Sequence, residues 1–417
     1  MPRSPASSPL TPGTGVRGAV AGAVALALGW FSFAGAMTNA THRRNPDTAL
    51  RFTGDDAVAL AALADRRIAD QGTAATVDAE TLKLARESLK RQALNPVALR
   101  LIGIGASVKG GFAAGRPAMS AANRLSRRDL PTQFWLIEEA VSRGDVAGAL
   151  GHYDHALRTK PGSQQLLFPV LTSAVEDPAL WPAFGRYVRE PAPWLGDFAR
   201  FSIRNSAKPR AIAEFLRRSG GLPHEEVYAA LEAELLKRLA EADAFADAGR
   251  YYRSLDGANP AILTEAGFTG ATTEARFAPL TWELFASPGI SSAFLRDETG
   301  EAIRLHATME GSTTGAVARK IIYVQPGRYR FRATQRTAAA AEGATAQWEL
   351  RCGGSRGANI IWSKSVALLA DGSTVDEVIA IPAGCGAITL RLLAAAGTSP
   401  GGIEAIFGPA SLARLAD

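Results

Sequence analysis

The chain has 417 residues, of which 47% are hydrophobic and 21% are charged, with two cysteines, five histidines and a formal net charge of +6. This length exceeds one ordinary hydrophobic core, so we expect two or three domains. The apolar content excludes a disordered chain. Two cysteines exclude a disulfide-dense scaffold or a multi-cysteine zinc module.

The positive charge is concentrated near the N-terminus. Residues 1–54 contain one acid, Asp47, and five arginines: Arg3, Arg17, Arg43, Arg44 and Arg51. The rest of the chain is close to neutral. A nucleic-acid-binding protein carries its excess charge on the folded domain that contacts the phosphates, so we expect no nucleic-acid partner.

Residues 18–41 form a charge-free, largely apolar segment that is long enough for a membrane helix. The basic residues 1–17 before it are typical of the n-region of a secretory signal, and Ala34-Gly35-Ala36 matches the small-residue cleavage pattern. The segment is therefore a cleaved signal peptide, an uncleaved signal anchor or a buried helix of a soluble fold. The lack of a polar face argues against the third interpretation.

We expect the protein to be located in the cell envelope. Either the segment anchors it in the inner membrane with the body in the periplasm, or cleavage near Ala36 releases the body into the periplasm. Contact with the membrane is expected only if the segment is not cleaved. Arg43, Arg44 and Arg51 follow the segment, so the positive charges do not favour a cytoplasmic N-terminus.

Residues 55–263 predict a helical array, because apolar residues recur at spacings of three and four between short Gly and Pro turns. The clearest unit comprises residues 134–140 and 143–157. It resembles a tetratricopeptide repeat, a helix–turn–helix unit of about 34 residues. The matching positions are Leu136, Gly144, Ala149, Tyr153, Ala156 and Pro161. The resemblance implies a stacked array that binds a protein partner in the envelope.

Residues 267–417 predict an antiparallel β-sandwich or jelly roll, because short alternating runs are separated by turn signals. In residues 328–333, Tyr329, Phe331 and Ala333 are expected to point inward and three arginines outward. The predicted fold class is α+β and multidomain: an N-terminal membrane or signal helix, an α-solenoid over residues 55–263 and this sandwich.

The run at residues 282–284, followed by residues 321–331 with their Pro-Gly turn, resembles the jelly-roll carbohydrate-binding modules. The resemblance implies sugar-stacking aromatic residues, for which the candidates are Trp282, Tyr323 and Trp362. The outward arginines that could contact an acidic glycan are Arg328, Arg330 and Arg332. The alternatives are that the aromatic residues belong to the core or cover an edge, and that the arginines form a solvated face or protect a sheet edge.

Cys352 ends one predicted strand, and Cys385 lies in the turn before another. In an exported domain the two cysteines are expected to form a structural disulfide. In a cytoplasmic protein they would instead be two reduced, buried thiols. No Cys-x-x-Cys spacing is present, so we expect no redox site.

The sequence offers no complete catalytic or metal motif. Residues 353–357 match G-x-S-x-G, but a strand-like run follows instead of a helix, and no histidine lies beyond His306. His152 and His155 provide two metal ligands without a third. We expect neither catalytic residues nor a bound metal or cofactor.

These features predict a non-enzymatic scaffold or adaptor of the cell envelope. The combination resembles bacterial envelope proteins associated with exopolysaccharide assembly, which implies that the chain supports glycan assembly through protein–protein contacts. The alternative is a polysaccharide-binding protein that acts through its C-terminal sandwich.

Overall fold

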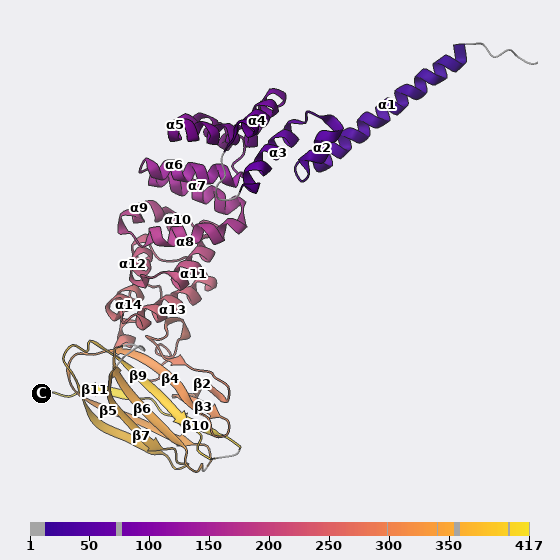
Figure 1. Ribbon diagram of the computed structural model, residues 1–417. Coiled ribbons are helices and arrows are strands. Elements are labelled where there is room, and N and C mark those ends of the chain that lie inside the picture. Colours follow the sequence, from indigo (N-terminus) through magenta and orange to yellow (C-terminus); the bar gives the residue numbers. More distant parts are fainter. Residues whose placement is uncertain are drawn as a thin grey trace, which may run out of the picture. The chain divides into compact units, whose positions relative to one another are not determined.

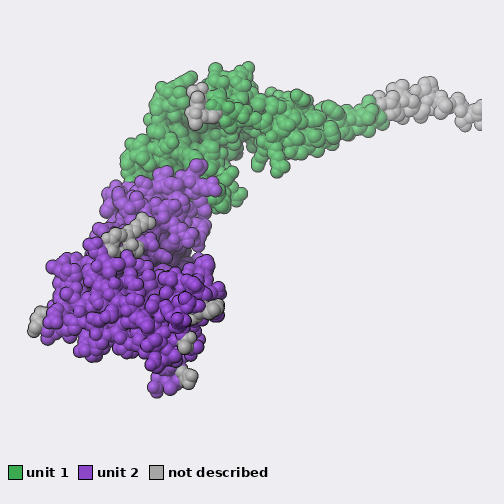
Figure 2. All heavy atoms as spheres, turned by 60° about the horizontal axis from the view of Figure 1, so that its bottom comes forward, with its two compact units in different colours: residues 1–163 green, residues 164–417 purple. Residues whose placement is uncertain are grey.

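The computed structural model describes residues 13–71, 77–297, 299–339, 341–353, 359–398 and 401–416, and the side chains from residue 21 onward. The chain divides into two compact units, Met1–Ser163 and Gln164–Asp417 (Figures 1 and 2). The division lies inside the predicted array of residues 55–263, and the later helices belong to the same unit as the β-sandwich. The predicted domain boundaries stay a prediction.

The first unit begins with two helices that contact each other, α1 (Gly13–Thr41) and α2 (Pro46–Thr53). Helix α1 ends where the charge-free segment ends, and His42 and two arginines follow. Within the described residues, two helical stretches are long and apolar enough to cross a membrane: Ala21–Thr41 and Pro96–Leu125. The N-terminal apolar helix is thus a candidate signal or membrane anchor.

The remaining helices of the first unit are α3 (Ala57–Asp70), α4 (Ala79–Arg91), α5 (Pro96–Leu125), α6 (Leu130–Ser142) and α7 (Val146–Thr159). Each begins after an acid or amide whose side chain accepts a hydrogen bond from a first-turn N–H. The capping residues are Asp56, Asp78, Asn95, Asp129 and Asp145. Such caps satisfy N–H groups that have no partner within the helix.

Helix α5 is two helices joined at Gly110 and Gly111, where the backbone leaves the helical region. The halves fold back on each other, because a Cβ atom on Gly115 would lie 2.6 Å from the carbonyl oxygen of Gly103. In a straight helix these two residues would be about 18 Å apart. Each half is therefore too short to cross a membrane alone.

Helices α6 and α7 coincide with the predicted repeat unit. Leu136, Ala149 and Ala156 are buried, and Gly144 adopts a positive φ of 70° at the turn between the helices. Helix α5 begins at Pro96 and α6 begins 34 residues later. The helical content and the turns are confirmed, whereas membership of the tetratricopeptide family stays a prediction.

The second unit begins with helices α8 (Gln164–Val175), α9 (Trp181–Phe184), α10 (Arg186–Arg189), α11 (Leu195–Asn205), α12 (Pro209–Ser219), α13 (Glu226–Glu241) and α14 (Phe245–Tyr252). Aromatic rings pack between them: the Phe168 and Phe198 rings are 5.6 Å apart, and those of Trp194 and Phe198 are 5.8 Å apart. The Tyr323 hydroxyl donates a hydrogen bond of 2.5 Å to the Phe245 carbonyl oxygen, which ties α14 to the sandwich.

The sandwich is formed by β1 (Glu283–Leu284), β2 (Ile290–Arg296), β3 (Ile303–Met309), β4 (Thr314–Tyr323), β5 (Gly327–Thr337), β6 (Thr345–Cys352), β7 (Asn359–Ala367), β8 (Ser373–Ile381), β9 (Ala387–Ala395), β10 (Ile403–Phe407) and β11 (Ser411–Arg414). The first sheet has the order β1-β4-β9-β6-β7. In the second sheet, β5 pairs with β8 on one side and with β11 and β10 on the other, and β3 and β2 follow β10. All these pairings are antiparallel.

The sandwich core is aromatic. Trp348 lies at its centre, with ring centroids 5.4 Å from Phe331, 6.4 Å from Phe407 and 6.5 Å from Trp282. All four side chains are at most 1% exposed. Strand β5 alternates as predicted, because Tyr329, Phe331 and Ala333 are buried and the arginines between them are exposed. The α+β fold class is confirmed.

Candidate functional site on the second sheet

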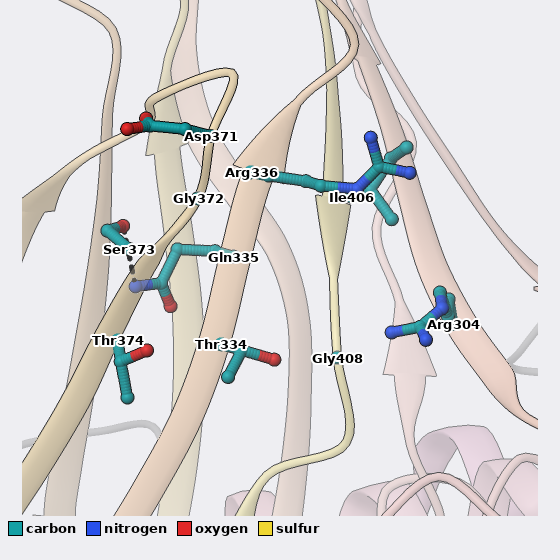
Figure 3. A pocket seen from close by; sticks show the side chains of 10 residues that line it. All are labelled: Arg304, Thr334, Gln335, Arg336, Asp371, Gly372, Ser373, Thr374, Ile406 and Gly408. Atoms are coloured by element: carbon teal, nitrogen blue, oxygen red, sulfur yellow. Dashed lines mark hydrogen bonds between the residues drawn. The ribbon is translucent and has the colours of Figure 1, made fainter.

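A cavity of about 250 Å³ lies on the outer face of the second sheet (Figure 3). It is bordered by strands β3, β5, β8 and β10 and by the loop before β8, and its lining residues are Arg304, Thr334, Gln335, Arg336, Asp371, Gly372, Ser373, Thr374, Ile406 and Gly408. This volume lies below the roughly 300–1,000 Å³ of pockets for drug-sized ligands. The cavity therefore has room for a small group and not for a whole drug-sized ligand.

Glycine allows a close approach where the chain leaves β10. A Cβ atom on Gly408 would lie 2.2 Å from the Thr334 hydroxyl oxygen, so a larger residue would require the Thr334 side chain to move. The Gly408 N–H donates a 2.8 Å hydrogen bond to the Thr334 carbonyl oxygen. This close approach places the link between β10 and β11 against the cavity.

Gln335 connects the cavity to the core. Its side chain is 2% exposed, accepts a 3.2 Å hydrogen bond from the Trp348 indole and donates a 2.9 Å bond to the Ser373 hydroxyl. Ser373 in turn donates to the Ala367 carbonyl oxygen at 2.7 Å. These bonds hold β8 against β5, so this wall of the cavity is built by buried, hydrogen-bonded groups.

Two guanidinium groups lie on one side of the cavity, and Asp371, Ser373 and Thr374 lie on the other (Figure 3). Arg336 is exposed and has no ion pair with any described residue. Arg304 approaches Asp297 at only 3.8 Å. Guanidinium groups bind carboxylates in a planar, bidentate manner, and hydroxyl and carboxylate groups hydrogen-bond to sugar hydroxyls.

The three predicted stacking residues lie apart from this cavity. Trp282 is 1% exposed, so it belongs to the core, as the alternative interpretation predicted, and its ring is not accessible to a sugar. Trp362 is half-buried, with its ring 5.3 Å from Phe331. Tyr323 is half-buried against α14, and burial raises the pKa of its hydroxyl to about 12.

Tyr323 borders a second cavity, of about 540 Å³, with Thr264, Val324, Gln325, Tyr329, Leu412 and Arg414. The Tyr329 hydroxyl donates a 3.0 Å hydrogen bond to the Gln325 carbonyl oxygen, and the Arg414 guanidinium donates a 2.8 Å bond to the Gln325 amide oxygen. Its polar groups are therefore largely engaged with one another.

The predicted arginine row is largely neutralised by its neighbours. Arg330 makes two hydrogen bonds to Asp376, of 2.6 and 2.8 Å, and Arg332 contacts the same carboxylate at 3.1 Å. The Arg330 hydrogen bonds hold the pKa of Asp376 below its ordinary value. Arg328 is exposed. The edge-protection alternative is wrong because β5 is paired on both sides. The row is exposed, and its contact with an acidic glycan stays a prediction.

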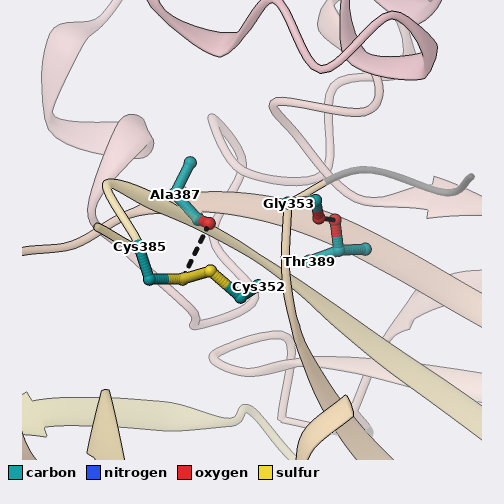
Figure 4. Close-up of a disulfide and its surroundings, with 5 residues drawn as sticks. All are labelled: Cys352, Gly353, Cys385, Ala387 and Thr389. Atoms are coloured by element: carbon teal, nitrogen blue, oxygen red, sulfur yellow. Dashed lines mark hydrogen bonds between the residues drawn. A yellow bond between two sulfur atoms is a disulfide. The ribbon is translucent and has the colours of Figure 1, made fainter. Parts of the chain in front are cut away.

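The disulfide between Cys352 and Cys385 is present, with Cα atoms 5.6 Å apart (Figure 4). It joins the end of β6 to the turn before β9, as predicted. Cys385 is 1% exposed, and beside it the Thr389 hydroxyl donates a 2.8 Å hydrogen bond to the Gly353 carbonyl oxygen. A disulfide is typical of proteins outside the reducing cytoplasm.

The other candidate motifs show no assembled reactive site in the described part of the chain. The His152 Nδ1–H donates a 2.9 Å hydrogen bond to the Gln133 side-chain oxygen, and burial lowers the pKa values of His152 and His155. No group of three or more His, Cys, Asp or Glu side chains there could hold a metal. Residues 354–358, including most of the G-x-S-x-G match, lie outside the described residues.

Sequence reasoning missed the cavity itself. Arg336 could have been found, because it continues the alternating arginine row of β5 by two further steps. Arg304 and Asp371 could not, because they lie on β3 and in the loop before β8, and pairing of these strands with β5 and β10 brings them together.

The sequence matches no protein-family model, and it matches none of the curated proteins. Solved structures similar to part of the chain include the family 11 carbohydrate-binding module from Clostridium thermocellum in complex with a β-1,3-1,4-mixed-linked tetrasaccharide. That similarity has 12% identity and a TM-score of 0.25, over 37% of this chain and 98% of the module. A family 16 carbohydrate-binding module has 11% identity and a TM-score of 0.23, over 30% of this chain and 86% of that one.

The xylan-binding domain CBM22-1 from Paenibacillus barcinonensis Xyn10C has 10% identity and a TM-score of 0.24, over 32% of this chain and 87% of that one. Since the identities are this low, any ligand of the present chain has to be inferred from its own cavity.

Proposed function

We propose that this chain is an envelope protein that binds an acidic polysaccharide through its C-terminal sandwich, without catalysing a reaction. The observation that carries the proposal is the cavity on the second sheet, where Arg304 and Arg336 lie opposite Asp371 and two hydroxyl residues. The guanidinium groups would bind the carboxylate of one sugar unit, and the opposite wall would bind its hydroxyls.

Recognition would rest on charge and hydrogen bonds, because none of the described residues that line this cavity is aromatic. Of the aromatic residues predicted to stack on sugars, Trp282 is buried in the core and Tyr323 hydrogen-bonds to α14, whereas stacking by the half-buried Trp362 stays a prediction. Binding of this kind is salt-sensitive at an exposed site, because dissolved ions weaken attraction between exposed charges and the Debye length shortens from about 10 Å at 0.1 M to about 3 Å at 1 M salt.

The helical array would supply a second, protein-binding function. Stacked helix pairs present extended surfaces to protein partners, and this part of the proposal rests on the resemblance and on the helix pairs of the first unit. The chain would thereby connect a glycan to another envelope component, for example during the assembly or export of an exopolysaccharide.

The proposal is tested by affinity electrophoresis of the full chain in detergent against a panel of uronate-containing and neutral polysaccharides. We expect retardation by at least one uronate polymer. We expect Arg336→Ala to weaken this binding about tenfold or more, because a hydrogen-bonded charge contributes about 1.5–3 kcal/mol.

Arg414→Ala is the matched control, since it removes the same charge from the second cavity of the same sandwich. It should leave the affinity unchanged. Loss of binding in Arg414→Ala with full binding in Arg336→Ala would contradict the assignment, and so would the absence of retardation by every polymer.

A further inference from the structure

The exposed part of helix α1 is a band of large apolar side chains. They are between 51% and 78% exposed, and they are Val24, Leu26, Leu28, Trp30, Phe31 and Phe33. An apolar surface of this size is unusual in water and marks contact with lipid or another apolar surface.

The C-terminal part of α1 is different, because it packs against α2. Ala34 and Thr38 are each 4% exposed, and Ala49 of α2 is fully buried. The hydroxyl groups of Thr38 and Thr53 are 3.4 Å apart. The Ala34-Gly35-Ala36 pattern therefore lies inside a continuous helix, with one of its residues covered by a neighbouring helix.

An aromatic cluster lies where the exposed band meets the packed part. Phe52 of α2 has its ring centroid 5.8 Å from Phe33 and 6.4 Å from Trp30, and the Trp30 and Phe33 rings are 6.2 Å apart. Aromatic side chains of this kind gather at the boundary between the hydrocarbon and the headgroups of a membrane.

Positive charge begins beside this cluster. Arg43, Arg44 and Arg51 are exposed and lie in the turn after α1 or on α2. The turn is fastened to α3 because Arg66 donates to Asp47 at 3.1 Å and to the Arg44 carbonyl oxygen at 2.8 Å. Basic side chains next to a membrane are attracted by anionic headgroups, each by about 1 kcal/mol.

The helix length fits a bilayer on the other side of the cluster. The charge-free part of α1 up to the cluster, residues 18–33, extends about 24 Å at 1.5 Å per residue, and Arg17 precedes it. The hydrocarbon core of a bilayer is about 30 Å thick. With Phe33 at one boundary, Arg17 lies about 6 Å inside the other, a distance that a long basic side chain can bridge to the headgroups.

We propose that α1 and α2 together form a membrane anchor that the mature protein retains. The part of α1 before Phe33 spans an anionic bilayer, and α2 lies at its surface, held there by the Trp30–Phe33–Phe52 cluster and the three arginines. Cleavage after Ala36 does not occur, because proteolysis concentrates in non-helical segments and this one lies inside a continuous helix, with Ala34 covered by α2.

Two measurements on the full chain test this anchor. Intact mass and N-terminal sequencing of the protein from membranes should find residues before Met37 still attached. In vesicles of phosphatidylethanolamine and phosphatidylglycerol, lipids brominated near the headgroup should quench the fluorescence of Trp30 more than lipids brominated deep in the chain. The Trp30 signal is the difference between wild type and Trp30→Phe.

Phe52→Trp in the Trp30→Phe background places a tryptophan on α2, and it should show the same shallow quenching. Trp362→Phe is the control, because it removes a tryptophan of the sandwich whose signal should not be quenched by either lipid. A mature chain that begins at Met37 overturns the proposal. Quenching of Trp30 mainly by the deep lipid, or an unquenched tryptophan at position 52, does so as well.

Discussion

Lys320 is fully buried, and its ammonium group donates hydrogen bonds to the carbonyl oxygens of Ile262, at 2.9 Å, and Leu280. Burial lowers its pKa to about 7, while Glu265 acts in the opposite direction. One side chain of β4 thus holds the segment between α14 and β1 onto the sandwich.

The buried lysine predicts a pH-dependent stability. Its pKa is about 7 in the folded state against 10.5 ordinarily, so between these values the unfolded chain binds more protons. The free energy of unfolding should therefore rise from pH 7 to pH 9.5 in wild type relative to Lys320→Met. Urea unfolding of the two proteins at several pH values measures this difference, and parallel curves would show that Lys320 stays charged when folded.

Strand alternation predicted which residues of β5 face inward, because neighbouring side chains of a strand point to opposite faces. It could not predict which aromatic residues stay exposed. Trp282 precedes the two-residue strand β1, and Tyr323 is covered by α14 from elsewhere in the chain. Alternation predicts to which face of its sheet a side chain points. Whether that face is exposed to solvent depends on which other elements pack against it.

At the scale of single elements, the hairpin inside α5 depends on close contact between its halves. A Cβ atom on Gly115 would lie 1.9 Å from the Ser107 hydroxyl and 2.6 Å from the Gly103 carbonyl oxygen. Gly115→Ala should therefore force the halves apart and destabilise this unit by about 1–3 kcal/mol, the usual cost of overpacking. Hydrogen exchange of residues 96–125 should accelerate.

Gly151→Ala is the control for this substitution, because nothing lies within 4 Å of its Cβ position in the middle of α7. It should stabilise the helix by about 0.5–1 kcal/mol through its higher helix propensity. Equal exchange rates in Gly115→Ala and wild type would show that the halves of α5 do not pack as described.

The disulfide between β6 and the turn before β9 closes a loop with a sequence separation of 33. Replacing both cysteines by alanine should lower the free energy of unfolding of the sandwich by about 2–4 kcal/mol, because the open chain gains conformational entropy. Urea unfolding with and without reductant measures the effect. Wild type should lose stability on reduction and the double variant should not; a reductant-insensitive wild type would contradict the bridge.

The elements themselves could be predicted well where local patterns are strong. The turn at Gly144, the Pro-Gly turn before β5 and the cysteine pair all follow from short-range sequence signals, and the structure contains each of them. Sequence reasoning missed the hairpin in α5, although Lys109 and the Gly110-Gly111 pair that follows it are a turn signal at this point.

At the scale of the whole molecule, the net charge of +6 does not show that positive side chains gather at two separate places. The N-terminal arginines lie beside the proposed membrane anchor, and the sandwich has a near-neutral total with two guanidinium groups at its cavity. The sequence could show the first, because those arginines are neighbours along the chain. It could not show the second, because the cavity combines residues from β3, β5, β8 and β10.

The central claim is that the full chain binds an acidic polysaccharide through the carboxylates of the polymer. It is tested most directly by comparing two polymers that differ only in those carboxylates. A uronate polymer that binds in the panel is compared, by isothermal titration calorimetry, with the same polymer after reduction of its carboxyl groups to alcohols. We expect the uronate form to bind at least tenfold more tightly, and increasing salt to remove this difference. Equal affinity for the two forms, or an affinity that salt does not change, would contradict the account.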